Sequence, residues 1–275
     1  MLRLAIAVAS ENSPASAFVV WRGFVASIAK ARRLGYDGVE LALQEAGEID
    51  VAEIEHLLRD NALACPCIST GQVFANLGLY FTIGDAARRG RVIDVFKGII
   101  EVAGRLGAMV NIGRARGFIE PGQILADATQ RFADVARGLC QYAADQGVRL
   151  VLEPVNRYEI NFIHSLSDAA HLLDAVGAPN LSLMPDVFHM NIEDRTIAGE
   201  LERFGPRISY VHLADSNRLA PGQGHTDFAA IFAALQRIGY QGWASVEILP
   251  KPDPNTAAAQ AIAYLRPLME SYGRF

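Results

Sequence analysis

The sequence predicts an α/β fold, a single-domain (β/α)₈ TIM barrel that takes in residues 1–275. Short apolar runs alternate with longer segments of helical period along the whole chain, and the alternation occurs eight times. A barrel of this kind takes about 250 residues. Because 51% of the 275 residues are hydrophobic, the chain can form one large core.

Eight apolar runs predict the strands in chain order: Arg3–Ala9, Gly38–Leu43, Leu63–Ser69, Met109–Gly113, Arg149–Glu153, Leu181–Asp186, Ile208–Leu213 and Trp243–Ile248. The segments between and after them predict the helices: Phe18–Leu34, Val51–Asn61, Ala86–Leu106, Ile124–Gln146, Ser167–Val176, Ile197–Phe204, Phe228–Ile238 and Thr256–Ser271. Glycines mark several helix ends, where a residue tolerant of positive φ is needed: Gly35, Gly107, Gly147, Gly177 and Gly239. An open, doubly wound sheet would usually have a glycine fingerprint after its first strand. The segment Ala9–Asn12 stands there instead.

Charge and composition disfavour several classes of protein. The formal net charge of −5 disfavours a nucleic-acid partner, which needs a basic face. No apolar run reaches the roughly 20 residues of a membrane span, and the opening run is too short for a signal peptide. Cys65, Cys67 and Cys140 lack the spacing of a CxxC site. We therefore expect reduced, structural cysteines and a cytoplasmic protein.

Four side chains able to bind a metal fall at or near the carboxyl ends of the last four predicted strands: Glu153, Asp186, His212 and Glu247. A barrel gathers its active site at that rim. Side chains alternate along a strand, so the neighbouring Leu152, Val211 and Val246 would face the helices, where apolar residues belong. The pattern predicts that the four ligands converge inside the barrel rim.

This ligand set favours one divalent ion per chain. A single strand-end carboxylate is more often a loop cap or an ion-pair partner, and a single strand histidine is often a core residue. Four such strand ends together indicate a metal site instead, because carboxylates in apolar strands are costly unless a cation compensates them. Oxygen ligands with one imidazole suit Mn²⁺, with Co²⁺, Mg²⁺ or Zn²⁺ as alternatives.

Longer motifs surround these residues: Leu152-Glu153-Pro154-Val155-Asn156-Arg157-Tyr158-Glu159, Asp186-Val187-Phe188-His189, Val211-His212-Leu213-Ala214-Asp215-Ser216-Asn217-Arg218 and Gly222-Gln223-Gly224-His225-Thr226-Asp227-Phe228. They resemble the xylose isomerase-like barrel superfamily, and most of all its ketose 3-epimerase branch of tagatose and psicose epimerases. The resemblance covers nearly the whole chain. It implies a sugar epimerase in which the four ligands hold Mn²⁺ or a similar ion, while Glu159, His189 and Arg218 grip the oxygens of the substrate. His225 departs from the usual pattern, and we expect it to be a solvated loop residue.

The implied reaction is the C3 epimerisation of a ketose or keto-sugar acid through a cis-enediolate. A metal ion polarises the ketone and acidifies the adjacent C–H group. The enediolate is flat, so a proton returned to its other face inverts the carbon, and this needs two bases. Glu153 and Glu247 are the expected pair, because ligation through one oxygen leaves the other free. His189 has a second interpretation, as a helix-start histidine that orients Asp186.

Two arginines, Arg114 and Arg116, follow the fourth predicted strand. Guanidinium is the preferred bidentate partner of carboxylate and phosphate. This stretch and Phe81–Asp85 also resemble family members that act on keto acids of the sugar series. We therefore expect at least one of the two arginines to contact an acidic substrate group. The alternative is an exposed pair, or an ion pair with Glu40 at the end of the second strand.

Three other functions stay open at this point. An aldose–ketose isomerase of the hydroxypyruvate isomerase type would use the same ligands but move the proton between C1 and C2. An endonuclease IV-like enzyme would need a basic groove and more metal-binding histidines than this chain, with six histidines in all, provides. An inactive ligand-binding barrel would lack a ligand or base, and none is missing. We expect a small sugar or sugar-acid substrate, no nucleic-acid or membrane partner, and a homo-oligomer such as a dimer or tetramer.

Overall fold

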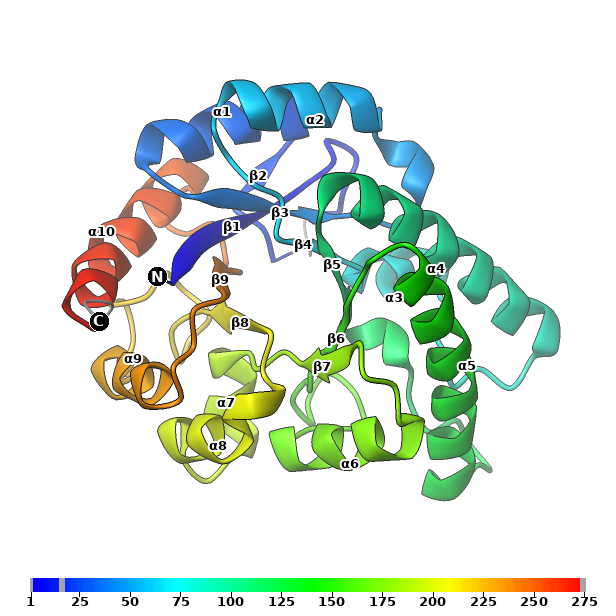
Figure 1. Cartoon of the computed structure of the whole chain (residues 1–275). Helices are drawn as coiled ribbons and strands as arrows, with labels where there is room; N and C mark the ends of the chain where they lie inside the picture. Colours follow the sequence, from blue (N-terminus) through cyan, green and yellow to red (C-terminus); the bar gives the residue numbers. More distant parts are fainter. Residues whose placement is uncertain (1, 15–17, 273–275) are drawn as a thin grey trace.

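The computed structural model describes residues 2–14 and 18–272, and it confirms the (β/α)₈ barrel. Figure 1 shows a ring of strands with the helices arranged around its outside. The strands are β1 (Arg3–Ala9), β2 (Trp21–Arg22), β3 (Gly38–Ala42), β4 (Cys67–Ser69), β5 (Met109–Ile112), β6 (Leu150–Leu152), β7 (Leu181–Leu183), β8 (Tyr210–Leu213) and β9 (Trp243–Val246). Each of the eight predicted strands contains one of these, and β2 is an addition.

All paired strands run parallel, in the order β7-β6-β5-β4-β3-β1-β9-β8. Isolated parallel bridges between Leu183 and Ile208 and between Asp186 and His212 connect β7 to β8. These bridges close the ring, so all the strands end at one rim. The second bridge also places two predicted metal ligands next to each other.

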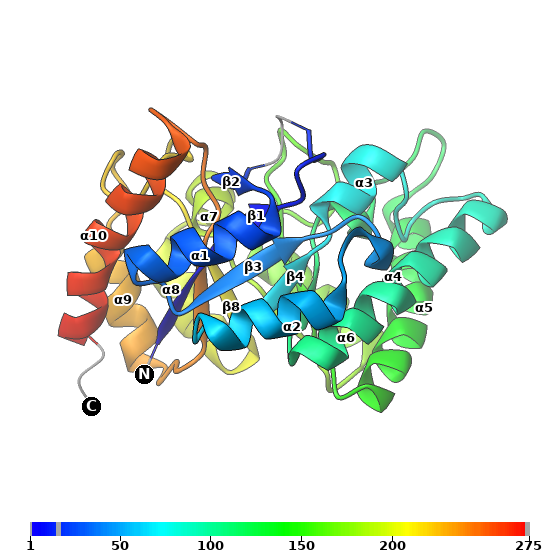
Figure 2. The ribbon, with the colours of Figure 1, turned by 90° about the horizontal axis from the view of Figure 1, so that it is seen from above.

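The helices follow the strands around the ring. They are α1 (Phe24–Leu34), α2 (Val51–Asp60), α3 (Gly71–Leu77), α4 (Ala86–Leu106), α5 (Leu125–Asp145), α6 (Leu166–Val176), α7 (Val187–Glu193), α8 (Ile197–Phe204), α9 (Phe228–Arg237) and α10 (Pro254–Tyr272), with short 3₁₀ turns η1 (Ala46–Glu48), η2 (Arg114–Arg116) and η3 (Gly205–Arg207). In Figure 2, α3 and β2 lie at the edge toward which the strands run. Within the described residues, no helix is long and apolar enough to cross a membrane.

The prediction differs from the structure at three elements. The segment expected to begin a helix at Phe18 instead contains β2, which pairs with the end of β1, and the helix starts only after Gly23. Gly23 has a φ of 84°, which a helix does not accommodate. The helices α3 and α7 were not predicted, because seven residues are too few to display a helical period.

Apolar side chains pack on both faces of the strands, as the alternation of side chains predicted. One layer lies between the strands and the helices, and the other lies inside the barrel. Leu152, Val211 and Val246 belong to the large cluster between strands and helices. A smaller cluster is formed by residues from five different strands and by Met184, which directly follows β7. Its members include Val151 and Tyr210, which stand two positions before ligands. The same parity therefore directs Glu153 and His212 into the barrel. The three cysteines are buried and free, in agreement with the structural role expected of them.

Candidate metal centre and substrate pocket

Four ligand side chains meet at the rim of the barrel. Glu153 directly follows β6, Asp186 immediately precedes α7, His212 lies on β8 and Glu247 directly follows β9. One ligand atom from each lies within 4.8 Å of the other three. Glu247 is partly buried and the other three are buried. The structure thus brings together the four residues that the sequence singled out.

His212 has one ring nitrogen held by the protein and one directed at the other ligands. Nε2 lies 3.0 Å from both carboxylate oxygens of Glu40. Nδ1 makes no hydrogen bond, and it lies 3.4 Å from Oε1 of Glu153 and 4.0 Å from oxygens of Asp186 and Glu247. A carboxylate that accepts one ring N–H leaves the lone pair of the other nitrogen available, which is the usual arrangement of a metal-binding histidine.

The carboxylates of Asp186 and Glu153 are each oriented by the protein through one oxygen. Oδ1 of Asp186 accepts the backbone N–H of Phe188 at 2.8 Å, whereas Oδ2 is buried without a hydrogen-bond partner. Oε2 of Glu153 accepts the amide of Asn111 at 2.8 Å. Gly113 passes so close to Glu153 that an added Cβ would lie 2.9 Å from Oε2. The remaining oxygens and the free nitrogen of His212 fit a divalent cation.

The electrostatics of the cluster also favour a bound cation. Burial raises the pKa of Asp186 to about 7 and also raises the pKa of Glu247. Burial opposes the ionisation of Glu153 as well, but the neighbouring His212 outweighs it and lowers the pKa of Glu153 to about 2. Two buried carboxylates and one partly buried carboxylate lie beside one imidazole and repel one another, and a divalent ion at their centre would relieve this repulsion.

Glu40 is the functional residue that the sequence reasoning missed. It lies on β3, is fully buried, and accepts hydrogen bonds from Ser69 and, at 2.9 Å, from the hydroxyl of Tyr210, in addition to its contact with His212. Burial opposes its ionisation, but His212 lowers the pKa of Glu40 below its ordinary value. The available signal was a single carboxylate inside the apolar run Gly38–Ala42.

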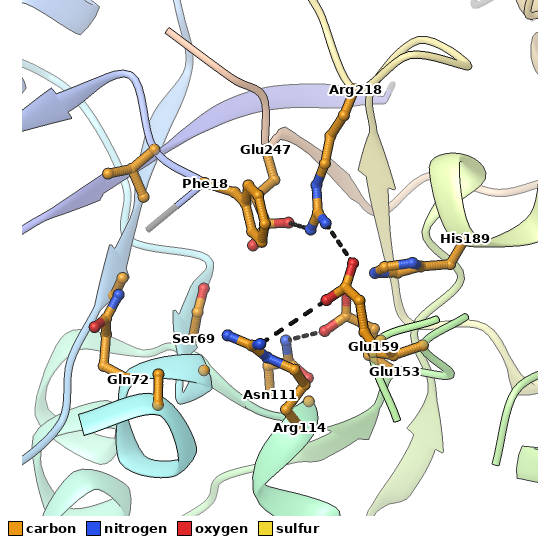
Figure 3. Close-up of a pocket in the computed structure, with 16 residues that line it drawn as sticks. Phe18, Ser69, Gln72, Asn111, Arg114, Glu153, Glu159, His189, Arg218 and Glu247 are labelled. Atoms are coloured by element: carbon orange, nitrogen blue, oxygen red, sulfur yellow. Dashed lines mark hydrogen bonds and ion pairs between the residues drawn. The ribbon is translucent and has the colours of Figure 1, made fainter. Parts of the chain in front are cut away.

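The two glutamates, Glu153 and Glu247, also line a pocket at the rim, together with Glu159, His189 and Arg218 (Figure 3). Arg218 donates to Oε1 of Glu159 and to Oε2 of Glu247, both at 2.8 Å. The three residues that the family resemblance assigned to the substrate therefore lie beside the candidate metal ligands.

Arg218 is held rigidly in this pocket. Its guanidinium lies 3.5 Å from the ring centre of Phe18 and 4.8 Å from that of Phe188. Its backbone has a φ of 62°, a left-handed conformation that residues other than glycine seldom adopt. Such conformations persist where the surrounding structure enforces them, often at functional sites.

His189 contacts both the pocket and Asp186. Its Nδ1 lies 2.8 Å from the amide nitrogen of Asn156, and its Nε2 lies 3.6 Å from Oδ2 of Asp186. Burial lowers the pKa of His189 well below its usual value. A neutral ring that accepts at Nδ1 carries its proton on Nε2, so it can donate toward the centre of the site. Both interpretations of this histidine are compatible with that geometry.

The two arginines after β5 lie in different environments. Arg114 lines the pocket, with its guanidinium 5.7 Å from the ring centre of Phe74. Arg116 is fully buried away from the pocket lining, and its guanidinium donates to four backbone carbonyls, those of Gly113, Glu153, Phe162 and Ile163. The donors of Arg116 bind the chain itself, so Arg114 is the arginine placed to meet the expectation that at least one of the two contacts an acidic substrate group. Within the described residues, neither arginine pairs with Glu40, whose partners are named above.

His225 is an exposed loop residue, as expected. Its Nδ1 lies 3.0 Å from the hydroxyl of Ser216. The loop around it is organised by Asp215, which accepts backbone N–H groups of Ser216, Gly222 and Thr226 at 2.8 to 3.1 Å.

Known proteins resemble this chain in sequence and in structure. A family model described as xylose isomerase-like TIM barrel matches residues 28–268. An L-ribulose 3-epimerase of Methylomonas sp. (strain DH-1) is 34% identical over 222 residues, which cover 78% of this chain and 75% of the relative. A ketose 3-epimerase of Arthrobacter globiformis is 30% identical over 224 residues, covering 78% and 74%. The crystal structure of a Methylomonas D-allulose 3-epimerase in complex with D-allulose superposes with a TM-score of 0.80 at 29% identity, covering 97% of this chain and 96% of that one.

Proposed function

The chain belongs to the xylose isomerase-like TIM barrel family, and on that premise we propose that it is a metal-dependent isomerase that epimerises a ketose at C3. The observation that carries the proposal is the cluster of Glu153, Asp186, His212 and Glu247, of which Glu153 and Glu247 line the pocket at the rim. Relatives that are 34% and 30% identical to this chain over the aligned residues are named as an L-ribulose 3-epimerase and a ketose 3-epimerase.

The four ligands would hold one divalent ion, and Mn²⁺ suits their three carboxylates and single imidazole, with Co²⁺, Mg²⁺ or Zn²⁺ as alternatives. The bound ion would polarise the ketone of the substrate and acidify the C–H group beside it. Glu40 would fix the proton of His212 on Nε2, so that Nδ1 faces the ion.

Glu153 and Glu247 would exchange the proton at C3. They follow β6 and β9, which are not neighbours in the barrel, because β7 and β8 lie between them. They therefore approach the pocket from different sides (Figure 3). One carboxylate would remove the C3 proton to give a flat enediolate, and the other would return a proton to the opposite face and invert the carbon.

The other pocket residues would orient the sugar. Arg218 holds Glu159 and Glu247 in fixed positions at 2.8 Å from each. The Nε2–H group of His189 would donate to an oxygen next to the reacting carbon. Glu159 would accept a hydroxyl of the substrate. Enzymes gain much of their rate from such groups fixed in place before the substrate binds.

The test is proton exchange at a defined carbon. Metal-loaded protein is incubated in D₂O with a panel of ketoses, and NMR records which carbon takes up deuterium. The proposal expects deuterium at C3 together with the C3 epimer. Deuterium at C2 of an aldose product, or at C1 of the recovered ketose, would instead indicate the aldose–ketose isomerase, and exchange at none of these carbons would contradict both. The buried free cysteines support a reducing compartment, and we propose the cytoplasm.

A further inference from the structure

On one wall of the pocket, two side chains have donor groups that form no hydrogen bond with the described residues. Arg114, from η2, and Gln72, from α3, both line the pocket, and these two elements pack against each other. The side-chain oxygen of Gln72 accepts a hydrogen bond from Asn76 at 2.9 Å. Its amide nitrogen has no hydrogen-bond partner among the described residues and can donate to a ligand. The carboxylate acceptors that line the pocket are Glu153, Glu159 and Glu247.

The guanidinium of Arg114 is partly buried and lacks a hydrogen-bonded partner among the described residues. Its side chain is 29% exposed, and the carboxylate oxygen nearest to it in an ion pair, Oε2 of Glu159, is 4.0 Å from Nη1. Glu159 is already bound to Arg218 through its other oxygen at 2.8 Å. Packing against Phe74 holds the arginine in place while its N–H groups remain available in the guanidinium plane.

Arg114 lies on the side of the pocket formed by Glu159. Glu159 separates the two pocket arginines, since Arg114 approaches Oε2 and Arg218 is bonded to Oε1. Arg218 in turn contacts Glu247, a candidate base. A ketose that reacts between Glu153 and Glu247 and extends past Glu159 would reach Arg114 (Figure 3).

We propose that the substrate carries a carboxylate at its end remote from the ketone, and that Arg114 and the Gln72 amide bind this carboxylate. Sugar hydroxyls donate and accept, whereas the guanidinium of Arg114 only donates, which suits a group that only accepts. A guanidinium binds a carboxylate with two parallel hydrogen bonds. One guanidinium and one amide match the single charge of a carboxylate better than a phosphate dianion. The inference rests on the proposed function, because it assumes that the reacting end lies between the two glutamates.

The experiment compares a ketohexose, its 6-carboxylate and its 6-phosphate on metal-loaded protein. For the wild type we expect kcat/KM for the carboxylate to exceed that for the neutral sugar by roughly 10–100-fold, the range of charge-assisted hydrogen bonds. Arg114→Met should remove most of this ratio. Gln72→Glu should also remove it, because the new carboxylate keeps its size and its bond from Asn76 but repels the substrate. Arg91→Met, an exposed substitution on α4, should leave the ratio unchanged.

Calorimetric binding of the same three compounds gives the same preference independently of turnover. Equal preference for the neutral sugar and the carboxylate in the wild type would overturn the inference. A preference for the phosphate, or an equal loss on both sugars in Arg114→Met, would overturn it too. Each of these results leaves deuterium exchange at C3 as the separate measure of the proposed function, so the two failures can be told apart.

Discussion

The barrel rim has two halves that use the same residue types in different ways. The ends of β6 to β9 present Glu153, Asp186, His212 and Glu247, among which Oδ2 of Asp186 and Nδ1 of His212 are buried without a hydrogen-bond partner. On the other half, Glu40 lies within β3, and its carboxylate binds Ser69, Tyr210 and His212.

Arg114 and Arg116 differ in the same way, since the protein satisfies the donors of only one of them. Arg116 donates to four backbone carbonyls and is fully buried, whereas Arg114 faces the pocket without a hydrogen-bonded acceptor among the described residues. The comparison teaches that residue type and position on the rim do not decide the role of a charged group. Its role depends on whether the protein itself satisfies its polar atoms, because a buried group left unsatisfied needs a ligand.

The largest effect should come from removing the nitrogen ligand. His212→Ala leaves three crowded carboxylates without their neutral donor, so we expect loss of the metal ion and of activity. Elemental analysis should find close to one divalent ion per wild-type chain and almost none in the variant. His56→Ala, an exposed change on α2, is the matched control. Chelation should abolish wild-type activity, and added Mn²⁺ or Co²⁺ should restore it. A metal-free protein with full activity would refute the metal site.

A smaller effect should follow from changing Glu40, which contacts the ligand but not the candidate ion position. Glu40→Gln keeps the shape of the side chain but weakens its hold on the N–H group of His212. We expect metal affinity to fall by roughly 10–100-fold, as is typical for partners of metal-binding histidines. Titration with Mn²⁺ measures this. Glu101→Gln on α4 is the control, and unchanged affinity in Glu40→Gln would mean that Glu40 only stabilises the fold.

Substitution of Arg114 and of Arg116 should differ mainly in the effect on the free energy of unfolding. Arg116→Met leaves buried backbone carbonyls without donors and should lower the free energy of unfolding by about 2–4 kcal/mol. Arg114→Met removes no hydrogen bond within the described protein and should change it by less than about 1 kcal/mol. Urea denaturation of both variants gives the comparison. Similar losses in the two would contradict the division of roles.

Much of this could be predicted from sequence, because it depends on local pattern. Apolar runs and helical periods located every strand of the ring, and strand parity placed Glu153 and His212 inside it. The different environments of Arg114 and Arg116 could not be predicted. They depend on how the 3₁₀ turn η2 packs against the chain around Ile163. The role of Glu40 could not be predicted either, because its partner His212 is distant in sequence and contacts it only across the folded barrel.

The most direct test of the central claim, two carboxylates acting on opposite faces of one carbon, is deuterium exchange in Glu153→Gln and Glu247→Gln. Each variant keeps one base, and its rate of epimerisation should fall by the ~10²–10⁴-fold typical of lost acid–base catalysis. With metal content verified, each should still exchange the C3 hydrogen of one epimer without inverting it. The account predicts that the two variants act on opposite epimers. Epimerisation near the wild-type rate in either variant, or exchange of the same epimer by both, would contradict it.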